Sequence, residues 1–128
     1  MDIEGAEYEA LPDVLKNAKN ITGIIMELHF NSDMAGFNRA TALLSALNKD
    51  FFLVNVHGNN CANRNNNTTF TTINSMGNIP KLLELTYINK NLVSSAHPSQ
   101  DQSHPSKIDM PNCKDLEDTY FEILTKSN

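Results

Sequence analysis

Residues 22–30 read TGIIMELHF, and this stretch decides the predicted fold. Its centre, residues 23–26, is apolar on both faces of an extended strand, which is typical of a central strand covered by helices on each side. Polar side chains return only at Glu27 and His29, close to the end of the stretch. The sequence therefore predicts a buried strand whose carboxyl end presents a carboxylate and an imidazole.

Helical and extended patterns alternate on both sides of this strand. Apolar residues recur at helical spacing over residues 11–18 and again over residues 37–47. Further apolar strands are predicted at residues 51–56 and 82–88, and residues 1–3 form a short strand before a glycine turn. This order predicts an α/β fold with a mostly parallel sheet and an antiparallel hairpin at one edge.

The composition changes character near residue 93. Residues 1–93 carry the periodic apolar pattern, whereas residues 94–128 begin with a stretch rich in proline and serine and without apolar periodicity. We therefore expect one domain over residues 1–93 and a tail over residues 94–128 with a short terminal element. A chain of 128 residues suits one domain of ordinary size.

Charge and hydropathy exclude several classes of protein. The formal net charge of −5 argues against a nucleic-acid partner. The apolar runs fall far short of the roughly 18 residues that a membrane span needs, so we expect no membrane insertion. The acidic first residues do not resemble a secretory signal, and the expectation is a cytoplasmic protein.

The two cysteines, Cys61 and Cys113, are too few for a disulfide framework. They also lack the neighbouring cysteines or histidines of a zinc site, and no metal site is predicted. One bridge between them is compatible with the sequence, but nothing calls for it, and a reducing interior is the simpler interpretation.

Candidate functional residues gather where the predicted strands end. In open α/β sheets, ligands bind beyond the carboxyl ends of the strands. The residues at these ends are Asp2, Glu4, Glu27, His29, His57, Asn59 and Asn60. These residues could also be explained without a functional role. In that case Glu27 and His29 would form a hydrogen-bonded pair that stabilises the fold, and His57 would be a residue of a turn. The sequence contains no glycine-rich phosphate-binding motif.

The same residues resemble a known family. Residues 1–11, MDIEGAEYEAL, resemble the "D-[IV]-E-G-[AS]-E" signature of the FkbM-type methyltransferases, which depend on S-adenosylmethionine. Residues 25–29, IMELH, are similar to that family's "E-[IL]-H" strand. Residues 51–60 with 79–87, and residues 108–112, resemble its "H-x-N-N … P-x-x-x-E-L-T-Y" and "L-D-x-P-N" segments. The resemblance covers nearly the whole chain in the same order.

This resemblance implies the C-terminal part of a Rossmann-like class I methyltransferase sheet, mostly parallel with an antiparallel edge hairpin. The N-terminal strands that hold the cofactor would lie upstream of the D-I-E-G motif, with which this chain begins. The activity implied is methyl transfer from S-adenosylmethionine to a hydroxyl oxygen of a sugar, glycan or other small metabolite. We expect this chain alone to be inactive and to bind S-adenosylmethionine poorly.

Site roles follow from the same resemblance and from position. The catalytic candidates are Glu4, His29 and His57, the cofactor-binding candidate is Asp2, and the acceptor-binding candidates are Glu27, Asn59 and Asn60. Two alternatives stay open: a non-catalytic module that keeps the acceptor-side surface, binding a glycan or a partner chain, and a gene fragment. The missing strands would leave an exposed sheet edge, through which the chain would associate with others.

Overall fold

The computed structural model describes residues 1–30, 33–61, 70–72, 78–100 and 103–122. The helices are α1 (Glu7–Leu15) and α2 (Met34–Asp50), with short 3₁₀ turns η1 (Ala18–Asn20) and η4 (Lys90–Leu92). The main sheet contains β1 (Gly23–His29), β2 (Phe51–Gly58) and β5 (Leu82–Asn89). Two small pairs join β3 (Phe70–Thr72) to β4 (Asn78–Pro80) and β6 (Ser103–His104) to β7 (Phe121–Glu122).

The main sheet is antiparallel, with the strand order β1-β5-β2. β5 lies between β1 and β2 and pairs antiparallel with both of them. The prediction of a mostly parallel, Rossmann-like sheet is therefore wrong. β1 and β2 do run in the same direction, with α2 between them in the chain. However, β5 lies between them in the sheet, so each is hydrogen-bonded to β5 and not to the other.

The predicted strand at residues 1–3 is not present as an element. Met1 nevertheless contacts the free edge of β1, because its amino group donates to the Ile25 carbonyl and its own carbonyl accepts from the Glu27 N–H. These two bonds place the start of the chain beside the second half of β1. The turn that follows Met1 is thereby held close to the end of that strand.

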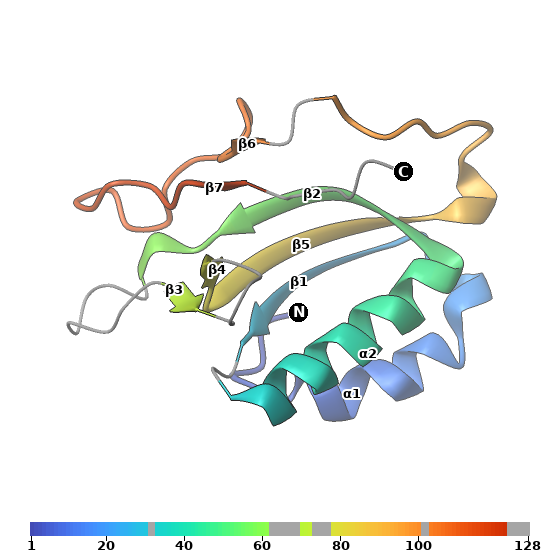
Figure 1. The fold of residues 1–128 in the computed structure, drawn as a ribbon. Helices are drawn as coiled ribbons and strands as arrows, with labels where there is room; N and C mark the ends of the chain where they lie inside the picture. Colours follow the sequence, from blue (N-terminus) through green and yellow to red (C-terminus); the bar gives the residue numbers. More distant parts are fainter. Residues whose placement is uncertain (31–32, 62–69, 73–77, 101–102, 123–128) are drawn as a thin grey trace.

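Both helices cover the same face of the sheet (Figure 1). Side chains alternate along β1, so Ile24, Met26 and Leu28 are buried towards the helices, whereas Ile25 is 71% exposed on the other face. The apolar run that predicted burial on both faces is therefore buried on one. The opposite face is open over Ile25.

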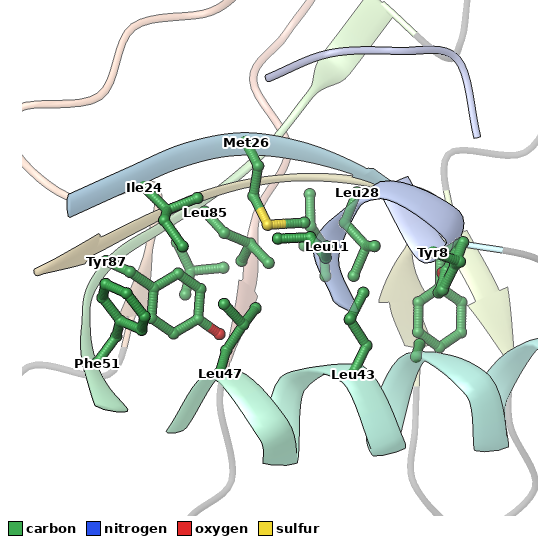
Figure 2. Packing of buried hydrophobic residues seen from close by; sticks show 14 of the residues in the cluster. Tyr8, Leu11, Ile24, Met26, Leu28, Leu43, Leu47, Phe51, Leu85 and Tyr87 are labelled. Carbon is green, nitrogen blue, oxygen red and sulfur yellow. The ribbon is translucent and has the colours of Figure 1, made fainter. Parts of the chain in front are cut away.

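The core fills the space between the helices and the sheet (Figure 2). Leu11 of α1 and Leu47 of α2 are completely buried against the strands, and Phe51 closes the end of the core next to Tyr87. Each such side chain contributes about 1.5–3 kcal/mol by leaving water. The Asp33 side chain caps α2 by accepting the Gly36 N–H, and aspartate is a preferred residue at the start of a helix.

Residues 103–122, which belong to the predicted tail, form turns and loops with the short strand pair β6–β7. A disulfide joins Cys113 to Cys61, which lies just beyond β2. The buried side chain of Asn60 donates to the carbonyls of Cys113, Leu116 and Glu117 and accepts the Cys113 N–H. The C-terminal segment, residues 103–122, is therefore attached to the end of β2 by the disulfide and by the hydrogen bonds of the Asn60 side-chain amide.

Neither α1 nor α2 has the length and apolar character needed to cross a membrane, and the same holds for the rest of the chain that the structure describes. The predicted absence of a membrane-spanning helix is confirmed for those residues.

Candidate functional site

β1 and β2 finish at the same end of the sheet, which we call the His29 end. His29, at the end of β1, is opposite Leu82, and Gly58, at the end of β2, is opposite Leu83, so both ends meet the start of β5. Met1 brings the first turn of the chain to the same end. Three predicted segments, residues 2–5, 27–29 and 57–60, are therefore neighbours, although the sheet is not parallel.

The turn over residues 2–5 has an unusual backbone that the sequence accommodates. Glu4 has φ of 54° and Gly5 has φ of 95°, and the second of these values suits glycine because no Cβ has to be placed. The Glu7 side chain holds the turn by accepting the N–H groups of Ile3 and Gly5 at 3.1 and 3.3 Å. The turn is thus fixed to the first residues of α1.

His29 lies among three carboxylates. Its Nε2 is 3.4 Å from Glu4 Oε2 and 3.5 Å from Glu27 Oε1, and its Nδ1 is 3.3 Å from Glu7 Oε1. The last contact is at ion-pair distance without the alignment of a hydrogen bond. Tyr8 donates its hydroxyl to the His29 carbonyl, which fixes the backbone at this point.

Glu7 is the residue of this site that the sequence interpretation missed, because a glutamate in the first turn of a helix is normally a solvated charge. It is completely buried. Burial raises its pKa, but the N–H groups of the turn, among them those of Ile3 and Gly5, and the nearby His29 outweigh burial, so the pKa is lowered overall. A signal was present in the spacing, since an acidic side chain in the first turn reaches back to the N–H groups before the helix.

Glu27 and Asn59, two of the residues predicted to bind an acceptor, are hydrogen-bonded to each other. Asn59 Nδ2 donates to Glu27 Oε2 at 2.6 Å, and Asn59 Oδ1 accepts the Cys61 N–H. Burial raises the pKa of Glu27, and the negative charges of Asp2 and Glu84 raise it further, although the Asn59 hydrogen bond opposes them. Glu27 therefore protonates more readily than an ordinary glutamate.

His57 occupies a different environment from His29. It is buried, and its two ring nitrogens lie 3.0 Å from Glu84 Oε2 and from Asp118 Oδ1. Desolvation lowers its pKa, but hydrogen bonds to the two carboxylates outweigh desolvation, and the pKa is raised. Both nitrogens are engaged, so this geometry favours a structural link between β2, β5 and the C-terminal segment over the predicted catalytic role.

Asn60, like His57, is buried and bonded to the C-terminal segment. Its side chain is inaccessible and its amide is committed to the backbone of the C-terminal segment. The acceptor-binding role predicted for it is not favoured by this position, whereas Asn59 faces the carboxylate cluster.

A cleft of about 310 Å³ lies over the open face of the sheet, beside the carboxylates that surround His29. Its walls come from the start of the chain, from the three strands and from the C-terminal segment. The polar residues that line it are Asp2, Glu27, Asn55, His57, Glu84, Thr86 and Asp109, and the apolar ones are Met1, Ile25 and Met26. Asp2 and Glu27 belong to both the cleft and the surroundings of His29.

A scan against protein-family models, a search of curated proteins and a search of solved structures each find no match to this chain.

Proposed function

We propose that this chain carries the acceptor-binding side of an S-adenosylmethionine-dependent methyltransferase site, which acts on a hydroxyl group of a sugar, glycan or small metabolite. The observation that carries the proposal is the position of His29. It lies between Glu4, Glu7 and Glu27, next to the turn whose sequence resembles the FkbM-type signature. Glu4 and Glu7 come from the start of the chain and Glu27 from the same strand as His29, so that one histidine, the side chain that most often acts as a general base, lies beside three carboxylates.

In the proposed reaction, His29 accepts the proton of the acceptor hydroxyl. The buried carboxylate of Glu7 lies beside Nδ1, which favours a proton on that nitrogen and leaves the lone pair of Nε2 free. Glu4 and Glu27 lie beside Nε2 and stabilise the imidazolium that proton transfer creates. Glu27 and Asn59 also provide the oxygen atoms that hydrogen-bond further hydroxyl groups of the acceptor.

The described residues fit S-adenosylmethionine only in part. The acidic lining of the cleft, with Asp2, Glu27, Glu84 and Asp109, suits the ammonium and sulfonium groups and opposes the carboxylate of the same molecule. The sequence also lacks a glycine-rich turn that would hold the nucleoside end. The proposal therefore assigns acceptor binding and proton removal to this chain, and no step of cofactor binding.

The coding DNA immediately upstream of Met1 provides the test. The proposal expects an in-frame segment with a glycine-rich turn there. The longer protein should transfer a labelled methyl group from S-adenosylmethionine to a sugar hydroxyl. The His29→Ala variant should lower the transfer rate by about 10²–10⁴-fold, the usual contribution of a general base. Binding of S-adenosylmethionine should not change in that variant.

Glu9→Gln serves as the control, because Glu9 is an exposed acid of the same helix as Glu7 and pairs with Arg39 away from the site. Its transfer rate should equal that of the unsubstituted protein. An upstream frame without a glycine-rich turn, or a His29→Ala variant with an unchanged rate, would contradict the proposal.

A non-catalytic binding module is the second candidate. The observation in its favour is the cleft of about 310 Å³, which is of the size of small-molecule sites and is formed by this chain alone. Saturation-transfer NMR on the purified chain with a panel of monosaccharides measures sugar binding, which both candidates expect. Sugar binding that Glu27→Gln abolishes, together with no methyl transfer by the longer protein, would favour the module over the enzyme.

A further inference from the structure

We propose that Asp2, Glu4 and His29 form a binding site for one divalent transition-metal cation of the Mn²⁺ or Zn²⁺ type. The inference goes beyond the proposed function, because cation binding by this chain requires neither S-adenosylmethionine nor an acceptor. The sequence predicts no metal site, since the residues come from a turn and from a strand that lie more than twenty positions apart.

The geometry is the first argument. One ligand atom from each of the three side chains lies within 4.8 Å of the other two. Glu4 Oε2 and His29 Nε2 are 3.4 Å apart, which is close to the spacing of two adjacent ligands on one ion, roughly 3.0–3.4 Å for bonds of about 2.1 Å. Asp2 and Glu4 are exposed, so their side chains are free to move the remaining distance.

The charge around His29 is the second argument. Glu7 and Glu27 add two further carboxylates to the three proposed ligands. Across the described residues, no lysine or arginine forms an ion pair with any of these acids; the two ion pairs that involve Lys or Arg are Lys16 with Asp13 and Arg39 with Glu9. The acids lie close to one another, since Glu4 and Glu27 both contact His29 Nε2 and Glu7 contacts its Nδ1. A bound cation would relieve the repulsion among them.

Glu7 provides an independent observation. It is completely buried, its Oε1 lies 3.3 Å from His29 Nδ1, and its Oε2 has no hydrogen-bond partner among the described residues. A carboxylate that accepts the N–H of one ring nitrogen is the usual support of a histidine that binds metal through the other nitrogen, and Glu7 occupies that position although its contact with Nδ1 lacks the alignment of a hydrogen bond. The same carboxylate holds the N–H groups of Ile3 and Gly5, and so it fixes the turn that carries the other two ligands.

The donor set indicates the kind of cation. One imidazole nitrogen and two carboxylate oxygens suit Mn²⁺, Fe²⁺ or Zn²⁺ better than Mg²⁺ or Ca²⁺, which prefer oxygen ligands alone. Three protein ligands also leave coordination positions for water or for a substrate oxygen, as in catalytic sites. A hydroxyl group bound to the cation would lose its proton more easily. In that state His29 would act as a ligand rather than as the proton acceptor.

The test uses the purified chain and three probes, MnCl₂, ZnCl₂ and MgCl₂. Titration of Mn²⁺ followed by electron paramagnetic resonance should show loss of the free-ion signal with one ion bound per chain, and calorimetry should show Zn²⁺ binding more tightly than Mg²⁺. The Glu4→Gln and Asp2→Asn variants should each bind Mn²⁺ at least tenfold more weakly. Both positions are exposed, so these substitutions leave the core intact.

Asp13→Asn is the matched control, because Asp13 is an equally exposed acid that pairs with Lys16 on the outer side of α1. Its Mn²⁺ affinity should equal that of the unsubstituted chain. The melting temperature of the unsubstituted chain should rise on addition of Zn²⁺, and that rise should be absent in Glu4→Gln. No binding at millimolar cation, or equal affinity in Glu4→Gln and in the control, would overturn the site. Either result would leave the methyltransferase proposal unaffected, since that proposal is tested without metal.

Discussion

Replacement of both Cys61 and Cys113 by serine should destabilise the protein about as much as truncating a large buried side chain to alanine. The disulfide joins positions 52 residues apart and closes a loop that contains β3, β4 and the whole of β5. In the unfolded chain this crosslink removes a large number of conformations. Its removal therefore favours the unfolded state even though the folded state loses few contacts.

The magnitude follows from the loop length. The chain-entropy relation gives an entropy change of roughly 14 cal/mol/K for a loop of this size, which is about 4 kcal/mol at 25 °C. Small domains have unfolding free energies of about 5–15 kcal/mol in total, so the loss would be a large fraction of the stability. The contacts of Asn60 and the link between His57 and Asp118 remain in the variant, so the C-terminal segment keeps non-covalent attachments.

Urea denaturation followed by far-ultraviolet circular dichroism measures the effect. The oxidised protein should be about 4 kcal/mol more stable than the double serine variant, and the reduced protein should match that variant. Amide exchange should become faster first in residues 103–122. A difference below about 1 kcal/mol between oxidised and reduced protein would refute the reasoning, because the loop entropy would then be offset by strain or by residual structure in the unfolded chain.

Three further predictions concern single side chains. Because the pKa of His57 is raised, its stabilisation should be complete below about pH 6.5 and lost as pH rises through the folded-state pKa; urea denaturation should show this slope, and His57→Gln should remove it. The lowered pKa of Glu7 acts in the opposite sense, so its contribution should be lost as pH falls below about 4.5, and Glu7→Gln should not show that acid loss. Gly23→Ala should cost about 1–3 kcal/mol in thermal denaturation, because the added Cβ would lie 2.7 Å from the Tyr87 carbonyl oxygen; unchanged stability would contradict the close approach of the two strand backbones at this position.

Apart from the strand predicted at residues 1–3, which is not present, the positions of the main helices and strands could be predicted from the sequence to within a few residues. The strand predicted at residues 51–56 extends over Phe51–Gly58, and the one predicted at 82–88 extends over Leu82–Asn89. Apolar periodicity reports which residues are buried, and it does not report strand direction. The reversed central position of β5 depends on how the chain between Gly58 and Leu82 returns, and no local residue pattern specifies that path.

Part of the candidate site could also be predicted from the sequence, and part of it could not. The gathering of Glu4, Glu27 and His29 could be anticipated, because each follows or ends an apolar stretch. The environment of His57 could not, since Asp118 is 61 residues away in a segment without apolar periodicity. The sequence leaves the pairing of the cysteines open for the same reason, as the spacing of two cysteines does not say whether their Cα atoms approach.

The two ends of the main sheet differ in how many insertions and substitutions they can accept over evolution. At the end away from His29, α2 ends at Asp50 and β2 begins at Phe51 without a connecting loop. There the Asn89 side chain also donates to the carbonyls of Ala18 and Ile21. An insertion at that end would disturb the core directly.

At the His29 end, three separate segments contribute side chains, and a long stretch of chain joins Gly58 of β2 to Leu82 of β5. New residues can be added or exchanged there while the helices and strands keep their register. Relatives of this chain should therefore diverge in ligand preference at that end while they retain the junctions at the other, and directed evolution of binding should begin with libraries placed on the same side.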